Sequence, residues 1–296
     1  MHLETLKTFC DVVETGSLSR AARLNHVTQS AVSQQLRALE QRYGRKLLDR
    51  SPRSGARTTE AGRMLYDEVK SLLERFSAVE QGLRQRANVI TGSVRVATVY
   101  SVGLHTLPPA MKAFVGAHRE VSLRLEYRRT DQVYDACLAG EVDFGIVAMP
   151  SRRPQHEIVP LRGDDLVLVA PPDHALARRR TLTLAALDGQ PFIAFDRDIP
   201  TRKLIDGFLR RHGVSVSYAM ELDNIETIKR TVEAGLGLSI LPLPALSHEL
   251  RARTLVTRPL PHGPLRRRVG VLYKKRRELS PPCRAFLELL TAELGE

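Results

Sequence analysis

Cysteine is scarce in this chain, and its three cysteines lie far apart. Cys10, Cys137 and Cys283 fall one in each third of the sequence and form no CxxC pair. An odd, dispersed set argues against a disulfide framework or a zinc site and favours a reducing compartment. No apolar run approaches membrane-spanning length, and the N-terminus lacks a signal-peptide pattern. We therefore expect a cytoplasmic protein without a membrane partner.

Motifs for catalysis are also missing. The sequence has no GxSxG elbow, P-loop, HExxH or dinucleotide fingerprint. Its nine histidines are scattered, and none has a second ligand type at metal-ligand spacing. The carboxylate pairs Asp164-Asp165 and Asp196…Asp198 fall where turns are expected, so we interpret them as turn and capping residues. The sequence predicts no enzyme, no catalytic residue, no metal site and no cofactor other than a small-molecule effector.

Positive charge is in excess. The 296 residues carry a formal net charge of +12, which favours a polyanionic partner. The chain is 43% hydrophobic, ample for packed cores, and its length suggests two or three domains.

The stretch 17–43 predicts two short helices joined by a tight turn. Ser17 is a good N-cap for a helix ending at Leu24, and Thr28 is a good N-cap for the next. In the second helix Ala31, Val32, Leu36 and Leu39 follow helical periodicity, so that face is expected to be buried.

The opposite face of this second helix is polar. Its side chains both donate and accept hydrogen bonds, which is what reading base edges in a major groove requires. Two helices with the second one polar and outward form a helix-turn-helix. The candidate DNA-binding residues are Thr28, Gln29, Ser30, Ser33, Gln34 and Arg37. A solvated polar face is the alternative.

A basic segment with Pro52 and Gly55 follows directly, and it predicts a wing over about residues 50–58. Its cations are Arg45, Lys46, Arg50, Arg53 and Arg57. Such residues would sit on phosphates or in the minor groove, with Arg53 positioning the wing.

Residues 1–90 resemble the DNA-binding half of LysR-type transcriptional regulators. The matching residues are Leu3, Phe9, Val12, Gly16, Ser17, Ala21, Ala22, Leu24, Thr28, Gln29, Ser30, Ser33, Leu39, Glu40, Leu47, Arg50, Thr59, Ala61 and Gly62. Ser30 stands where many members have proline. The rest of the chain also fits the family. The resemblance implies a transcription regulator with an effector domain, assembled as a dimer of dimers, with RNA polymerase as a further candidate partner.

Thr59 is expected to cap a long helix, about 60–88. Leu65, Val69, Leu72, Phe76, Val79 and Leu83 alternate spacings of four and three, which is typical of a coiled-coil seam. We interpret the helix as a dimer contact, so that a two-fold protein reads a dyad-symmetric site in double-stranded DNA. An intrachain packing helix is the alternative.

Beyond Thr91-Gly92-Ser93, strands alternate with helices, which implies a parallel sheet wrapped by helices. The resemblance implies a two-lobed fold like that of type II periplasmic binding proteins. The expected fold is therefore α/β: an N-terminal all-α winged helix-turn-helix with a long linker helix, then this two-lobed domain. The expected segments are 1–59 for DNA binding, 60–91 for the linker helix and hinge, and 92–296 for the effector domain. Lobe one would be 92–161 with 266–296, and lobe two 162–265.

A small anionic metabolite is expected in the cleft between the lobes. Ser101, Thr130 and Thr201 each follow a predicted strand and begin a helix, where backbone N–H groups and the helix dipole favour anions. The resemblance implies effector contact for Ser101 and Thr201. Ile199 and Asn224 are further pocket candidates. The alternative is that all three hydroxyls are ordinary N-caps.

Two functional classes fit these observations. The favoured one is a DNA-binding regulator gated by a small molecule. The other is a two-lobed solute binder or enzyme in which the helix-turn-helix only packs. Lobe two has no cysteine, which disfavours the redox mode of the family. The clusters 178–180 and 274–277 could touch DNA, although a solvated basic edge explains them as well.

Overall fold

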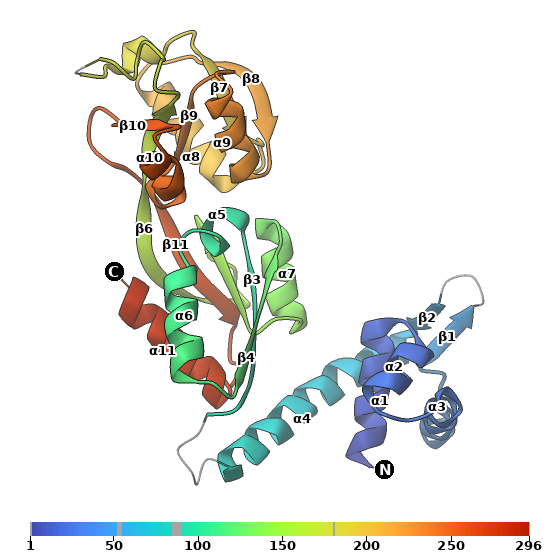
Figure 1. Ribbon diagram of the computed structural model, residues 1–296. Helices are drawn as coiled ribbons and strands as arrows, with labels where there is room; N and C mark the ends of the chain where they lie inside the picture. Colours follow the sequence, from blue (N-terminus) through green and yellow to red (C-terminus); the bar gives the residue numbers. More distant parts are fainter. Residues whose placement is uncertain (1, 52–54, 85–89, 180, 296) are drawn as a thin grey trace. The chain divides into compact units, whose positions relative to one another are not determined.

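The computed structural model describes residues 2–51, 55–84, 90–179 and 181–295 (Figure 1). The chain divides into two compact units, residues 1–88 and 89–296. The first unit is helical with a small hairpin, and the second is an α/β structure.

The first unit is built on three helices, α1 (Leu3–Thr15), α2 (Leu18–Leu24) and α3 (Gln29–Tyr43). Ser17 accepts a hydrogen bond from the Arg20 amide, and Thr28 accepts one from the Ala31 amide, so both predicted N-caps are confirmed. The fully buried side chains of Phe9, Val12, Ala21, Val32 and Leu36 form the centre of this unit's core.

The hairpin β1 (Leu48–Ser51) and β2 (Gly55–Thr58) follows α3 as the wing. The Glu40 carboxylate accepts from the Leu47 and Leu48 amides at 2.9 and 3.2 Å, which fixes where the hairpin leaves the helix. Thr59 accepts from the Gly62 amide at 3.0 Å and caps α4 (Glu60–Arg84), as predicted. Arg53 lies outside the described residues.

Some apolar side chains of helix α4 pack within the chain and others are exposed. The coiled-coil seam predicted along the whole helix is therefore corrected for its first part. Val69 is 5% exposed inside the core of the first unit, and Leu65 packs beside it. By contrast, Leu72, Phe76 and Val79 are 49%, 46% and 60% exposed. The first turns of α4 therefore take part in intrachain packing through Leu65 and Val69, whereas Leu72, Phe76 and Val79 are open to a second chain. The side chain of Leu83 lies outside the described residues.

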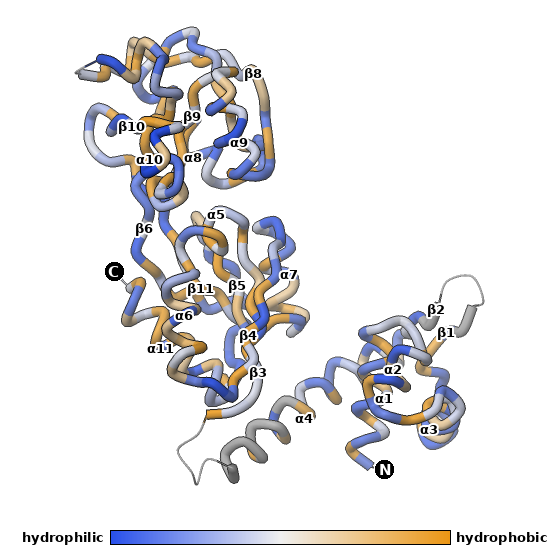
Figure 2. Tube along the Cα trace, in the orientation of Figure 1, coloured by the Kyte–Doolittle hydropathy of each residue, from blue (hydrophilic) through white to orange (hydrophobic). Residues whose placement is uncertain are grey.

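The second unit is organised on a seven-stranded sheet in the order β10-β6-β11-β5-β3-β4, with β9 also pairing with β6. The strands β3 (Gly92–Thr98), β4 (Val121–Tyr127) and β5 (Phe144–Ala148) are parallel to one another. Every residue of β5 is buried, and Figure 2 colours this strand as largely hydrophobic. A strand buried on both faces explains this continuous apolar run.

Helices cover both faces of this part of the sheet, which we call lobe one. They are α5 (Tyr100–Gly103), α6 (Pro108–Ala117), α7 (Thr130–Ala139) and α11 (Pro281–Leu294). Phe114 and Phe286, from α6 and α11, pack on one face with a ring distance of 4.9 Å. Val133 and Cys137 of α7 pack on the other face.

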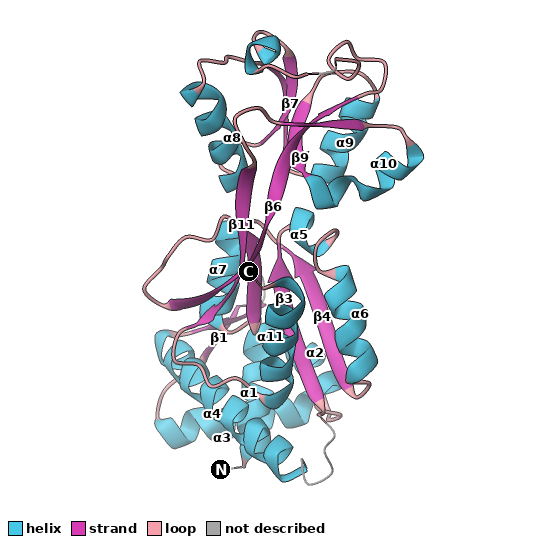
Figure 3. Cartoon of the chain, turned by 90° about the vertical axis from the view of Figure 1, so that its left-hand side faces the viewer, coloured by secondary structure: helices cyan, strands magenta, loops and turns pink. Residues whose placement is uncertain are grey.

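Two long antiparallel strands join the lobes, β6 (His156–Ala170) and β11 (Leu265–Lys274). Figure 3 shows both running from lobe one into the second lobe. The sequence predicted a strand only over 165–170, so β6 is longer than expected. As a result, Asp164 and Asp165 lie within a strand rather than at a turn, which corrects their interpretation as turn residues.

Lobe two comprises the elements between these crossings. They are the 3₁₀ helix η2 (Leu184–Leu187), β7 (Pro191–Phe195), α8 (Pro200–Arg211), β8 (Ser217–Leu222), α9 (Ile225–Glu233), β9 (Ser239–Pro242), the 3₁₀ helix η3 (Leu243–Leu246), α10 (Ser247–Ala252) and β10 (Val256–Pro259). Their buried apolar residues form one continuous core. Neither α10 nor β10 is predicted from the sequence.

Candidate functional site

The outer face of α3 is polar and accessible. Thr28, Gln29, Ser30, Gln34 and Arg37 are exposed, and Ser33 is half-buried. Their spacing places them opposite the buried Val32, Leu36 and Leu39. The structure therefore brings all six predicted residues of this helix to one side of the first unit.

Some of these side chains already have partners. The Gln29 carbonyl oxygen accepts from the Ser19 hydroxyl at 3.0 Å, which ties α3 to α2. The hydroxyls of Thr28 and Ser30 lie 2.9 Å apart. Within the described part of the chain, Gln34 and Arg37 make no side-chain hydrogen bond, so a base edge could take them without displacing a partner.

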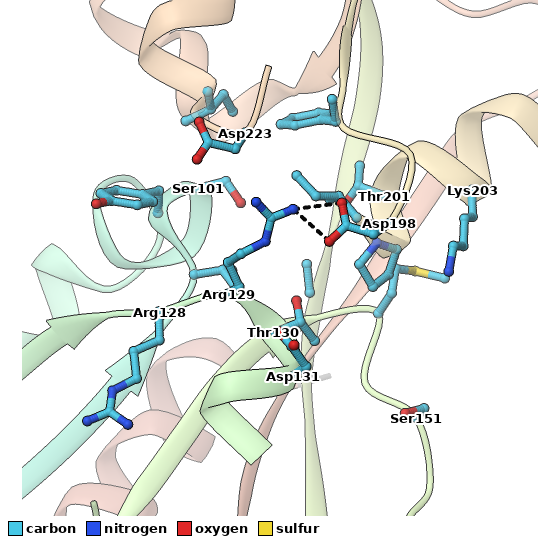
Figure 4. A pocket seen from close by; sticks show the side chains of 18 of the residues that line it. Ser101, Arg128, Arg129, Thr130, Asp131, Ser151, Asp198, Thr201, Lys203 and Asp223 are labelled. Carbon is cyan, nitrogen blue, oxygen red and sulfur yellow. Dashed lines mark hydrogen bonds and ion pairs between the residues drawn. The ribbon is translucent and has the colours of Figure 1, made fainter. Parts of the chain in front are cut away.

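A cavity of about 470 Å³ lies between the two lobes of the second unit. Figure 4 shows it with its lining side chains as sticks. Lobe one contributes the residue after β3, α5, the start of α7 and the segment from the end of β5, and lobe two contributes the segment after β7 and the start of α8. The cavity brings together the predicted residues Ser101, Thr130, Ile199 and Thr201.

The three predicted hydroxyls lie in first turns but cap none of them. The N-cap residues are Val99, Arg129 and Ile199, so Ser101, Thr130 and Thr201 lie one or two positions further in. The alternative that they are N-caps is therefore wrong. Thr201 is only 2% exposed, and within the described residues its hydroxyl makes no hydrogen bond.

Asn224 is placed differently from the other candidates. Its side-chain oxygen accepts from the Glu226 amide at 2.8 Å and caps α9, and it is not among the residues that line the cavity. Its neighbours Asp223 and Ile225 line the wall instead.

Ser101 is tied to a buried ion pair on the crossing strands. Arg267 of β11 donates from Nη1 to the Ser101 hydroxyl at 2.9 Å. Its Nε donates to Asp164 of β6 at 2.8 Å, and its Nη2 lies 2.7 Å from the same oxygen without hydrogen-bond geometry. Burial lowers the pKa of Arg267, although the Asp164 carboxylate opposes the shift. Because the Ser101 oxygen accepts from Arg267, its own proton is free to donate toward the cavity.

Arg129 is the cation that reaches across the cavity. It precedes α7 in lobe one, and its Nη2 lies 2.6 Å from each carboxylate oxygen of Asp198 in lobe two. Asp196 is further, at 3.4 Å from the same nitrogen. The hydrogen bond to Asp198 raises the pKa of Arg129. The two carboxylates belong to the second predicted pair, and both follow β7 before α8, but they bridge the lobes.

The other cations that line the cavity do not contact Asp198: two have other partners, and the third has no ion pair within the described residues. Arg128 bonds Glu141 at 2.7 Å and Glu126 at 2.9 Å, and its side chain points away from Asp198 in Figure 4. The Arg153 guanidinium stacks 3.9 Å over the Tyr134 ring. Lys203 on α8 is exposed and makes no ion pair within the described residues.

A second polar contact joins the lobes near α9. His105 of lobe one lies 2.7 Å from the Glu226 carboxylate, which also bonds Lys229 at 3.0 Å. Lys229 is 3% exposed and pairs with the buried Glu249 at 2.9 Å. Burial lowers the pKa of His105 despite the bond to Glu226, so the ring is neutral near pH 7 and donates its Nε2 proton.

Sequence reasoning missed Arg129, Asp198 and Arg267 as site residues. A signal existed for the first, because Arg128-Arg129 immediately precedes Thr130 at the end of a predicted strand. No local signal marks Arg267, since a basic residue in a strand is normally read as exposed. In the described part of the chain, no group of three or more His, Cys, Asp or Glu could hold a metal ion, and no helix is long and apolar enough to cross a membrane.

Family comparison agrees with this architecture. Residues 3–63 match the bacterial regulatory helix-turn-helix family of LysR type, and residues 87–295 match the LysR substrate binding domain. The RuBisCO operon transcriptional regulator of Allochromatium vinosum is 31% identical over 99% of this chain and 97% of its own length.

Solved structures of the same kind resemble the chain. A full-length OxyR variant from Pseudomonas aeruginosa superposes with a TM-score of 0.77 at 22% identity, covering 99% of this chain and 94% of that one. The regulatory domain of Synechocystis CcmR in complex with 2-PG gives a TM-score of 0.63 at 25% identity, covering 69% of this chain and 98% of that one. The relatives are named as transcriptional regulators, not as enzymes. With a matching winged helix-turn-helix and a matching two-lobed domain, this chain belongs to the LysR family of transcriptional regulators.

Proposed function

We propose that this LysR-type regulator binds a dyad-symmetric DNA site as a dimer or dimer of dimers, and that a small anionic metabolite in the interlobe cavity modulates its activity. The observation that supports the proposed effector most directly is the cavity between the two lobes. The Arg129 guanidinium, the Ser101 hydroxyl and the first turns of α7 and α8 converge on one space of about 470 Å³.

The size and lining of the cavity support a small organic effector. Cavities of roughly 300–1,000 Å³ with a few convergent polar groups are typical of small-molecule sites. Helix first turns and an arginine favour a carboxylate or phosphate group. The Synechocystis CcmR domain was solved with 2-PG, which supports a small ligand for this fold and makes 2-PG a sensible first probe.

On the DNA side, we propose that Gln34 and Arg37 read base edges, with Gln29, Ser30 and Ser33 beside them and Thr28 at the helix start. Arg53 stays a prediction for the wing. Replacing Gln34 with Ala should cost roughly 1–3 kcal/mol of preference for the cognate site, the range for a lost bidentate base contact. Gln41→Ala, an exposed change near the end of α3, is the matched control.

Genomic fragment selection followed by fluorescence anisotropy measures this preference. The proposal predicts that Gln34→Ala lowers the ratio of cognate to scrambled affinity and that Gln41→Ala keeps it. An unchanged ratio for Gln34→Ala would remove Gln34 from the reading face. Contact with RNA polymerase, and the cytoplasmic location, stay predictions.

A thermal-shift screen tests the effector. Wild-type protein is challenged with 2-PG, inorganic phosphate, sulfate and small carboxylates, and the hits are repeated on the double variant Ser101→Ala/Thr201→Ala. A stabilisation that is lost in the double variant supports the cavity as the binding site. If the stabilisation survives there, the ligand binds elsewhere, and a complete lack of hits favours a constitutive DNA binder.

A further inference from the structure

We propose that Asp198 is an internal competitor for the effector: its carboxylate occupies Arg129 until an anion displaces it, and it thereby sets which anions the cavity accepts. This inference rests on the proposed effector site. It adds a residue whose removal should strengthen binding, whereas removing an ordinary contact residue weakens it.

The bond between Arg129 and Asp198 resembles the contact an incoming anion would make. Arg129 is the lining arginine whose guanidinium reaches across the cavity toward lobe two, and Figure 4 shows the Asp198 carboxylate directly against it. The partner is a carboxylate, the same chemical group that a small organic acid presents. The Arg129 guanidinium therefore already pairs with a carboxylate from its own chain.

The geometry leaves this bond exchangeable. Both Asp198 oxygens straddle a single nitrogen, Nη2, at 2.6 Å, so the pair lacks the two parallel N–H···O bonds of a fork-to-fork contact. Nη1 has only a 3.5 Å bond to Asp196, and within the described residues Nε has no partner. The side chains of Arg129 and Asp198 are 42% and 66% exposed, and exposed pairs contribute little. An anion with better geometry can replace the carboxylate.

Charge explains why the competitor would select ligands. Two carboxylates, from Asp196 and Asp198, face one guanidinium, so the contact carries a local excess of negative charge. When a monovalent carboxylate displaces Asp198, one singly charged carboxylate replaces another at Arg129, so little binding free energy is gained. A divalent anion gains more Coulomb attraction from Arg129 and from Lys203, which also lines the cavity and has no ion pair among the described residues. The wild-type cavity should therefore discriminate against monovalent anions.

The same exchange alters the link between the lobes. Arg129 belongs to lobe one and Asp198 to lobe two, and they are 69 positions apart in the chain. An anion that takes Arg129 releases this bridge and stands in its place between the lobes. Ligand arrival would thus change what holds the two lobes together.

Asp198 could instead contact the ligand directly, and this role predicts the opposite effect of replacing it. If its carboxylate accepts a hydrogen bond from a ligand hydroxyl, replacing it would weaken binding. Asp198→Asn decides between these roles with little risk to folding, because the side chain is largely exposed and the change is isosteric. Asp131→Asn is the matched control: Asp131 lines the same cavity on α7 but has no bond to Arg129.

The experiment is isothermal titration calorimetry on the full-length protein at constant ionic strength and pH 7.5, with inorganic phosphate, sulfate and acetate as probes. We expect Asp198→Asn to bind phosphate and sulfate roughly two- to fivefold more tightly than wild type, since an exposed ion pair contributes up to about that factor. The preference for sulfate over acetate should shrink. Asp131→Asn should change affinity less, and adding Arg129→Gln to Asp198→Asn should abolish the gain.

The possible failures are distinct. If wild type binds phosphate and Asp198→Asn binds it no more tightly than Asp131→Asn does, the competitor role is wrong while the effector site stands. If Arg129→Gln leaves phosphate affinity unchanged, the anion does not use Arg129 and the inference falls as well. If neither wild type nor Asp198→Asn binds any anion, both the inference and the proposed anionic effector are overturned.

Discussion

Arg267 and Ser101 are joined by a 2.9 Å hydrogen bond, although 166 positions of the chain separate them. Arg267 is 1% exposed on a strand that crosses between the lobes, and Ser101 stands at the wall of the cavity. The bond orients the hydroxyl that the effector is proposed to meet. It also connects the cavity to the buried pair of Arg267 and Asp164 on the crossing strands.

Replacing Ser101 with Ala should therefore weaken anion binding. The loss of one hydrogen bond costs about 1 kcal/mol, which is roughly fivefold in affinity. Calorimetric titration with inorganic phosphate measures it. Ser151→Ala is the control, because Ser151 lines the same cavity but contacts Tyr134 only through its backbone. Equal effects of the two changes would contradict a specific role for Ser101.

Asp164→Asn should destabilise the protein strongly. It leaves the buried Arg267 cation without its counter-charge, a situation that typically costs about 3–5 kcal/mol. The adjacent pair supplies the comparison: Arg266 and Asp165 lie 2.6 Å apart, but their side chains are 68% and 41% exposed. Asp165→Asn should cost at most about 1 kcal/mol. Urea unfolding of both variants measures the difference, and similar losses would refute the burial argument.

Local signals in the sequence were enough to predict most of the elements. Ser17, Thr28 and Thr59 mark helix starts because a short hydroxyl side chain satisfies a free amide, and the structure shows all three bonds. Helices predicted over 200–212 and 281–294 correspond to α8 (Pro200–Arg211) and α11 (Pro281–Leu294). By contrast, β6 was predicted only in part, since Pro160 and Gly163 interrupt its pattern and its pairing with β11 lies in distant sequence.

The polar architecture of the site was harder to predict. Arg129 and Asp198 meet only because two lobes face each other, and no periodicity encodes that meeting. The position of Val69 fits the four- and three-residue spacing of a coiled-coil seam. In the structure, however, Val69 is buried in the core of the first unit, because α1 lies against the start of α4. Periodicity gives the face of a helix but does not say what covers that face.

The exposed stripe on α4 predicts association. Placing Asp at both Leu72 and Val79 should dissociate the assembly, because an interface cannot bury unpaired charges without a large cost. Analytical ultracentrifugation measures the mass. Ser71→Asp, an exposed change beside the stripe, should leave the mass unchanged. If the Leu72→Asp/Val79→Asp variant sedimented like wild type, this stripe would not be the dimer contact.

His105 predicts a pH dependence of stability. Its ring faces Glu226, with Lys229 and Glu249 behind, and burial holds its pKa below the ordinary value of 6.5. The folded state therefore binds a proton less readily than the unfolded state. The stability contribution is complete above about pH 6.5 and is lost as the pH falls through the folded pKa.

Burial works to raise the pKa of Glu226, but bonds from Lys229 and His105 outweigh it and lower that pKa. Its contribution is accordingly lost only in more acidic solution. Urea unfolding between pH 5 and 8 should show wild-type stability falling below about pH 6.5. His105→Gln, which keeps a donor for Glu226, should fall less over that interval. Parallel curves for the two proteins would show that His105 does not titrate as described.

The central claim is that an anion in the interlobe cavity controls DNA binding. Its most direct test is the affinity for a selected genomic fragment, measured by anisotropy while 2-PG or inorganic phosphate is titrated at constant ionic strength, because DNA affinity itself depends on salt. We predict a saturable change in wild-type affinity whose midpoint rises about tenfold or more in Ser101→Ala/Thr201→Ala, where two contacts of about 1 kcal/mol each are lost. If neither anion changed the DNA affinity, or if the midpoint were identical in the two proteins, control of DNA binding by an anion in this cavity would be contradicted.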